Sequence, residues 1–182
     1  MYQIVFNELS AAEMAALPKE LQLDKSLDAL SGSELVTVAR VLRVAQRKAL
    51  DAANSIAGIY DGEIDKDVTV LSFAGENSVT RGAISGVKSR HERERPLLIK
   101  SFRASEAFYG ALADQAEFLL SRQGAYSKTT NGLQFVDPNA VEGWNELYRK
   151  TQSMVVQYNA VEKERVGLEQ FQANGWVELK KQ

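Results

Sequence analysis

Apolar residues return every three or four positions along three stretches of the chain, which is the spacing of one face of an α-helix. The most regular stretch follows the capping box Ser31-Gly-Ser-Glu34 and is predicted to end at Asp61-Gly62. Its apolar stripe covers about four heptads and predicts a buried helix-packing seam made of Leu35, Val38, Leu42, Ala45, Ala49, Ala52, Ile56 and Ile59. Because alanine occupies the middle of this stripe, a second helix can approach closely there.

The second helical stretch is predicted to start at Pro96 and to end at Gly124. We expect it to be the partner of the first, with Tyr109 and Leu112 filling the space that the alanines leave. The third stretch starts at Asp137-Pro138, where the aspartate can cap the helix and the proline suits its first turn. This last helix is predicted to stop at residues 174–175, an Asn-Gly pair.

Other segments lack the helical period. Residues 2–6 are apolar enough for a short strand, and residues 67–73 are rich in β-branched side chains, which also favours a strand. Asn131-Gly132 is typical of a two-residue hairpin turn, because both residue types accept positive φ. Residues 75–95 show no sustained period and contain three glycines, so we expect a long mobile loop.

The expected fold class is therefore mainly α: an elongated bundle of three long helices, with a small β-hairpin between the last two and a short N-terminal strand. A chain of 182 residues suits a single domain, 1–182. Within it we expect an N-terminal strand and short helices (1–30), a long helix (31–62), a strand and flexible basic loop (67–95), and a helix, β-hairpin and long helix (96–175).

The composition argues against most catalytic chemistries. There is no cysteine, which excludes thiolate catalysis and cysteine-based metal sites. The single histidine, His91, has no recognisable catalytic partner, and we expect it to be solvated in a charged loop. Residues 75–86 lack the lysine ending of a phosphate-binding loop and the spacing of a dinucleotide fingerprint. We therefore expect no enzymatic activity, no cofactor and no metal.

Charge is concentrated in one place. The net charge of the whole chain is −2, but residues 81–95 carry a local excess of positive charge, from Arg81, Lys88, Arg90, Arg93 and Arg95 against two glutamates. Such a segment can bind a nucleic-acid backbone or an acidic protein partner. The alternative is a solvated segment in which opposite charges alternate and neutralise one another.

The opening YQIVFNELSAAEMAALPKELQ, from Tyr2 to Gln22, combines a short strand, a second capping box and an amphipathic helix. It resembles the first strand and helix of the RelE/ParE-type toxins, small ribonucleases that cut mRNA on ribosomes. The resemblance implies such an activity, and in that family the active residues are basic and aromatic side chains of later strands. No position of this chain matches them, so no catalytic residue is carried over.

We expect a non-enzymatic structural or assembly subunit of a larger homo- or hetero-oligomeric complex, such as a phage particle or a nucleoprotein complex. Its partners would be copies of itself or other protein subunits, because the long apolar stripes need a covering surface. The alternative is a nucleic-acid-associated protein, either toxin-like or a helical subunit lining RNA or DNA through residues 81–95. No signal peptide or membrane span is recognisable, so we expect a cytoplasmic or virion location without membrane contact.

Overall fold

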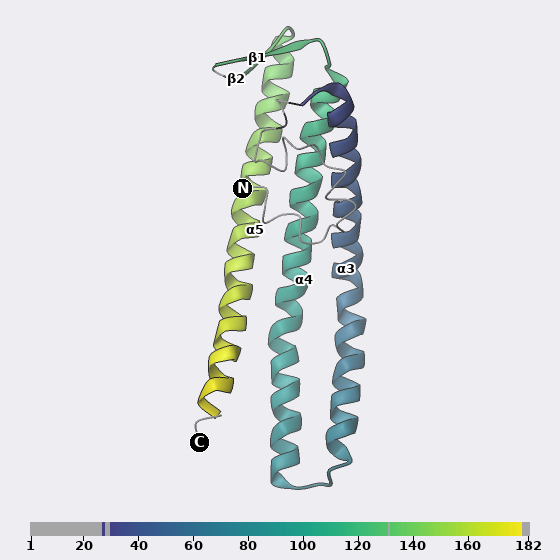
Figure 1. Ribbon diagram of the computed structural model, residues 1–182, viewed down its shortest axis with the longest axis vertical. Helices are drawn as coiled ribbons and strands as arrows, with labels where there is room; N and C mark the ends of the chain where they lie inside the picture. The colour runs from purple at the N-terminus through teal and green to yellow at the C-terminus, as the bar shows by residue number, and fades with distance from the viewer. Residues whose placement is uncertain (1–26, 28–29, 131, 180–182) are drawn as a thin grey trace. The chain divides into compact units, whose positions relative to one another are not determined.

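The computed structural model describes Leu27, residues 30–130 and residues 132–179, with side chains as far as Leu168. Within these ranges the chain forms α3 (Gly32–Ser72), α4 (Ser78–Ser121), β1 (Tyr126–Thr129), β2 (Gly132–Phe135) and α5 (Pro138–Leu179) (Figure 1). The predicted mainly α fold, with three long helices and a hairpin between the last two, is confirmed. The expected N-terminal strand and short helices, and with them the toxin-like segment Tyr2–Gln22, lie outside the described residues.

The chain divides into two compact units, and each long helix contributes to both. Unit 1 contains residues 32–49 of α3, residues 104–121 of α4, the β-hairpin and residues 138–158 of α5. Unit 2 contains residues 50–72 of α3, residues 78–103 of α4 and residues 159–179 of α5.

The core of unit 1 is built where α3 and α4 present their small and large residues to each other. Ala45 and Ala49 are fully buried, and Tyr109 and Leu112 belong to the same apolar cluster. The hairpin joins this cluster through Phe135, whose ring lies edge to face with that of Phe118 at a centroid distance of 5.9 Å. Burial of such apolar surface is the main stabilising term of the unit.

The ends of the elements follow the residue types found there. Glu34 accepts a hydrogen bond from the amide of Ser31 at 2.6 Å, which closes the predicted capping box at the start of α3. Asp137 accepts a hydrogen bond from the amide of Asn139 at 3.0 Å and caps α5, as predicted. Gly124 follows α4 with a φ of 82°, a conformation that glycine adopts without strain.

The β-hairpin is antiparallel, and Thr129 pairs with Gly132 at its closed end. The residues between the paired positions are therefore Thr130 and Asn131, one position earlier than the predicted Asn131-Gly132 turn; Asn131 itself lies outside the described residues. Gly132 has a φ of 112°, so the glycine still provides the positive φ that the turn needs.

The predicted end of the first helix and the strand after it are wrong. α3 continues through Gly62 to Ser72, so residues 67–72 are helical. The hydroxyls of Thr69 and Ser72 donate hydrogen bonds to the carbonyls four residues earlier, at 2.6 and 2.7 Å, which accommodates these residue types in a helix. Contact with α4 overrides the strand preference, because one helical face is half-buried at Tyr60, Ile64, Val68 and Leu71.

The predicted mobile loop 75–95 is also helical apart from its first residues. Asn77 caps α4 by accepting hydrogen bonds from the amides of Val79 and Thr80 at 3.0 and 2.9 Å. Pro96 lies inside α4 and does not start it. The third helix likewise continues past its predicted stop at residues 174–175 and reaches Leu179.

Candidate functional site

Unit 2 places the predicted basic residues on α4, where the helix separates them into different directions. Arg81, Lys88 and Arg95 are seven residues apart and therefore lie in one row along the helix. Arg95 donates to Asp61 of α3 at 3.0 Å. Arg90 pairs with Glu94 at 2.8 Å, and Arg93 donates to the carbonyl of Ser89 at 3.1 Å. Three of the five predicted residues are therefore already engaged within unit 2.

The remaining two line a shallow surface groove. Arg81 and Lys88 are exposed, and neither makes a hydrogen bond or ion pair with another residue in the ranges that the structure describes. The groove follows one face of α4 and is lined by Arg81, Ile84, Ser85, Lys88, Ser89 and Glu92. It therefore offers two cations and two hydroxyl groups, next to one carboxylate.

The two helices that meet in unit 2 carry opposite charge. We call residues 50–72 of α3 the acidic arm, because five acids and one lysine lie there: Asp51, Asp61, Glu63, Asp65, Lys66 and Asp67. Residues 78–103 of α4 are the basic arm, with seven arginines and lysines against two glutamates. The net charge is therefore −4 for the acidic arm and +5 for the basic arm. Sequence reasoning recognised the basic segment but missed its acidic counterpart, although the run from Asp61 to Asp67 was visible.

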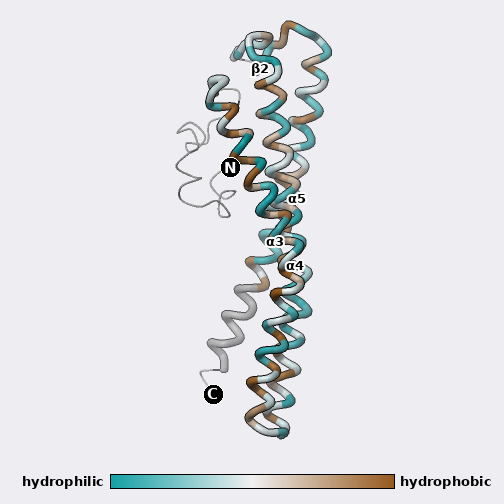
Figure 2. The backbone as a smooth tube through the Cα atoms, turned by 90° about the vertical axis from the view of Figure 1, so that its right-hand side faces the viewer, coloured by the Kyte–Doolittle hydropathy of each residue, from teal (hydrophilic) through white to brown (hydrophobic). Residues whose placement is uncertain are grey.

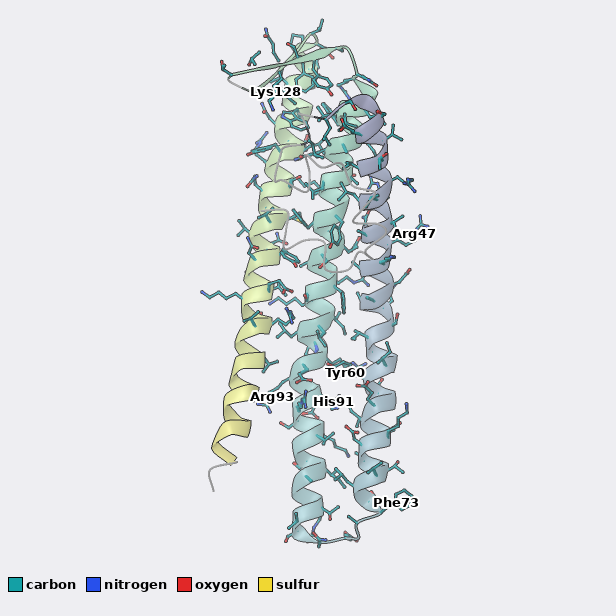
Figure 3. The ribbon with its side chains drawn as sticks, in the orientation of Figure 1. Arg47, Tyr60, Phe73, His91, Arg93 and Lys128 are labelled. Carbon is teal, nitrogen blue, oxygen red and sulfur yellow. The ribbon has the colours of Figure 1, made fainter. Side chains whose placement is uncertain are left out.

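The arms are held together around His91. The imidazole of His91 lies edge to face with the ring of Tyr60 (Figure 3), and its Nε2 is 4.0 Å from Asp67. The hydroxyl of Tyr60 donates to Glu94 at 3.5 Å. Burial, followed by the charges of Glu94 and Glu63, raises the pKa of Tyr60 above its ordinary value.

The expectation that His91 is solvated is wrong, because the residue is only 8% exposed. It packs between α3 and α4, where its ring fills the contact between the arms. Its buried Nδ1 has no hydrogen-bond partner. None of the described residues forms a group of three or more histidine, cysteine or acidic side chains that could hold a metal ion.

An apolar patch lies where the arms are joined. Val70, Phe73 and Val79 are 68%, 85% and 78% exposed at the turn between α3 and α4, and we call these three residues the tip. Figure 2 shows hydrophobic positions on both sides of this turn, and Phe73 points away from the helices in Figure 3. The sequence pattern predicts a strand for Val70 and Phe73 and therefore does not reveal the patch.

The predicted packing seam follows α3 only through unit 1. Leu35, Val38, Leu42, Ala45 and Ala49 are buried, whereas Ala52 and Ile56 are half-buried. Ile59 is 53% exposed and does not belong to the seam. In unit 2 the buried face passes instead through Ala53 and Tyr60, one residue later, because that is the face that α3 turns toward α4.

Unit 1 contains a separate ionic cluster that links its three helices. Arg43 of α3 donates to Asp114 and Glu117 of α4, both at 2.7 Å, and Lys150 of α5 donates to Asp114 at 2.8 Å. Burial would raise the pKa of Asp114, but hydrogen bonds from Lys150 and Arg43 outweigh it and hold that pKa below its ordinary value. Because every charge in the cluster is paired, we assign it a structural role.

Comparison of the chain with protein-family models, with curated proteins and with solved structures finds no match in any of the three. Within the described residues, no helix combines the length and the apolar character needed to cross a membrane.

Proposed function

We propose that this chain is a non-enzymatic helical subunit of a larger protein assembly, and that unit 2 provides its contact with other subunits. The observation that carries the proposal is the exposure of the tip, where Phe73 is 85% accessible beside Val70 and Val79. A large aromatic residue with two valines at one turn is an uncommon arrangement for a surface that faces only water. Burial of the tip against a partner would remove this apolar surface from solvent.

The polar groups of unit 2 support a binding role over a catalytic one. The single histidine contacts the ring of Tyr60 and the carboxylate of Asp67, and its Nδ1 makes no hydrogen bond to a serine or any other group of the described residues. General-base catalysis needs such a group within hydrogen-bond reach. The carboxylates and guanidinium groups nearby pair with one another across the arms or along α4.

The proposal is tested by placing a photo-crosslinking amino acid at position 73 of the full chain in cells that express it. We expect protein adducts from position 73, because the tip would lie in an interface. The matched control carries the same amino acid at Arg149, an exposed position on α5 in unit 1. Absence of protein adducts from position 73, or equal adducts from both positions, would contradict the proposal.

A second candidate function is nucleic-acid binding through the groove on α4. The observation that favours it is the pair of cations without partners, Arg81 and Lys88, which lie in one row with Ser85 between them. Phosphate oxygens accept hydrogen bonds from such groups. Binding of labelled RNA and DNA to the full chain should then weaken moderately as the salt concentration rises, as expected for two phosphate contacts, and Arg81→Gln with Lys88→Gln should abolish it. Equal binding by the double variant would exclude this function.

A further inference from the structure

We infer that the partner of unit 2 is a second copy of this chain, with the acidic arm of each copy lying against the basic arm of the other. The inference rests on the proposed function, since it names the partner for the same surface. It identifies the partner by charge, whereas the proposal above rests on the exposed apolar tip.

The charge that remains after internal pairing is the first argument. Within unit 2, Asp61 is paired with Arg95, and Lys100 of the basic arm is paired with Glu164 of α5 at 2.7 Å. The carboxylates of Glu63 and Asp65 in the acidic arm stay exposed and make no hydrogen bond or ion pair among the described residues. Asp51 of the acidic arm is also exposed and makes no ion pair among these residues, whereas the exposed Lys66 and Glu92 have the sign opposite to that of their own arm. Glu63 and Asp65 are two residues apart and lie on different sides of α3, whereas Arg81 and Lys88 share one row of α4. The charge that remains unpaired is therefore net negative on the acidic arm and net positive on the basic arm.

Self-complementarity is the second argument. A surface that carries both signs on two neighbouring helices can bind its own copy about a two-fold axis, because the axis brings each arm against the opposite arm of the partner. The contact then forms twice, with the same residues on both sides. A partner with a single sign of charge would be attracted by one arm and repelled by the other.

The net charge of the chain makes this local separation decisive. At −2 for 182 residues, two whole copies repel each other weakly at long range. Electrostatic attraction must therefore come from the arms, because a net charge of −4 lies on α3 and a net charge of +5 lies on α4. The tip adds apolar surface at the end of the same arms, so that one interface can bury both the charged and the apolar features.

The test is a charge-reversal experiment on the full chain, followed by sedimentation equilibrium. One variant combines Arg81→Glu with Lys88→Glu, and the other combines Glu63→Lys with Asp65→Lys. Each variant alone should self-associate at least about tenfold more weakly than the native chain, because like charges then face each other. An equal mixture of the two variants should regain association, because in the mixed pair both arm-to-arm contacts again join opposite charges.

The matched control combines Arg40→Glu with Arg47→Glu. These arginines are also exposed, seven residues apart and without a partner among the described residues, but they lie on α3 in unit 1. Self-association of this control should equal that of the native chain. Circular dichroism of all variants checks that their helices are intact, which is expected because every substituted residue is exposed.

Salt provides an independent readout. Raising the ionic strength from about 0.05 M to about 0.5 M shortens the screening length several-fold and should weaken self-association of the native chain. Self-association that changes neither with salt nor with charge reversal would overturn the inference. A native chain that is monomeric at low salt would also overturn it. If position 73 then still crosslinks to a different protein, the proposed function stands and only the identity of the partner is wrong. If position 73 also gives no protein adduct, the proposed function and the inferred partner are both wrong.

Discussion

The imidazole ring of His91 on α4 meets the phenol ring of Tyr60 on α3 edge to face, with centroids 5.0 Å apart. This contact lies at the centre of unit 2, where two helices of opposite charge are joined. An edge-to-face pair of rings stabilises a helix contact by more than the burial of its apolar surface alone. The chain therefore uses its one histidine as a packing residue.

Replacement of His91 by leucine should leave the stability of the protein unchanged within about 1 kcal/mol, or raise it. Leucine keeps most of the buried volume and removes Nδ1, which is buried without a hydrogen-bond partner and costs about 1–3 kcal/mol. His91→Ala leaves a cavity as well and should destabilise by about 1–3 kcal/mol. Urea unfolding measures both variants. A leucine variant that is as unstable as the alanine variant would show that the imidazole nitrogens have an essential partner.

Gly62→Ala should stabilise the protein by about 0.5–1 kcal/mol, because Gly62 lies inside α3 and nothing lies within 4 Å of an added Cβ atom. Gly75→Ala is the matched comparison: it also has open space but has a φ of 84°, so alanine there should destabilise by about 1 kcal/mol. Thermal melts of the two variants should shift in opposite directions. A lowered midpoint for Gly62→Ala would mean that α3 ends near residue 62.

Ala49→Leu should destabilise the protein by about 1–3 kcal/mol. Ala49 is fully buried in the same cluster as Tyr109 and Leu112, so three additional carbon atoms must displace these neighbours. The control is Ala160→Leu, an exposed position of α5, which should be tolerated with almost no cost. Chemical unfolding measures both, and an unchanged stability for Ala49→Leu would contradict close packing of α3 against α4.

Asp114→Asn should lower the free energy of unfolding at neutral pH by about 1 kcal/mol, because it breaks ion pairs with Arg43 and Lys150. The pKa of Asp114 is lowered in the folded state. Its stabilising contribution is therefore complete above the unfolded pKa, near 3.8, and is lost as the pH falls through the lower folded value.

The native chain should accordingly lose stability below pH of about 4 more steeply than Asp114→Asn, and the two curves should converge in strong acid. Asp51→Asn is the control, because Asp51 is exposed and makes no ion pair among the described residues. If the free energy of unfolding depends on pH equally in the native chain and in Asp114→Asn, the ionic cluster does not stabilise the protein.

The sequence by itself determined the elements whose signals are local. The capping box Ser31–Glu34, the Asp137 cap and the glycine after α4 are each recognised within a few residues, and the structure confirms them. The apolar stripe of α3 is equally regular through Ala49, because one face of the helix packs against the apolar residues of unit 1. Three helices and a hairpin follow from these patterns alone.

Tertiary contact decided what happens in unit 2. The face of α4 that meets α3 repeats every three or four residues, but polar side chains occupy half of its positions: Thr80, Ile84, Val87, His91, Glu94 and Leu98. A hydrophobic period is invisible in such a series, so the segment resembles a charged loop. Packing of one helix against another accepts polar groups that hydrogen-bond or lie at the edge of the contact, as Glu94 does with Tyr60.

The same physical reason explains the misplaced strand and the unrecognised tip. Val70 and its neighbours prefer a strand when each residue is weighed by itself, but half-burial of Tyr60, Ile64, Val68 and Leu71 against α4 favours the helix. Only this helical continuation carries Phe73 to an exposed turn and aligns Arg81 with Lys88 on one face. Local propensity therefore identified the helices and the hairpin, whereas the pairing of two helices positioned the residues of the candidate site.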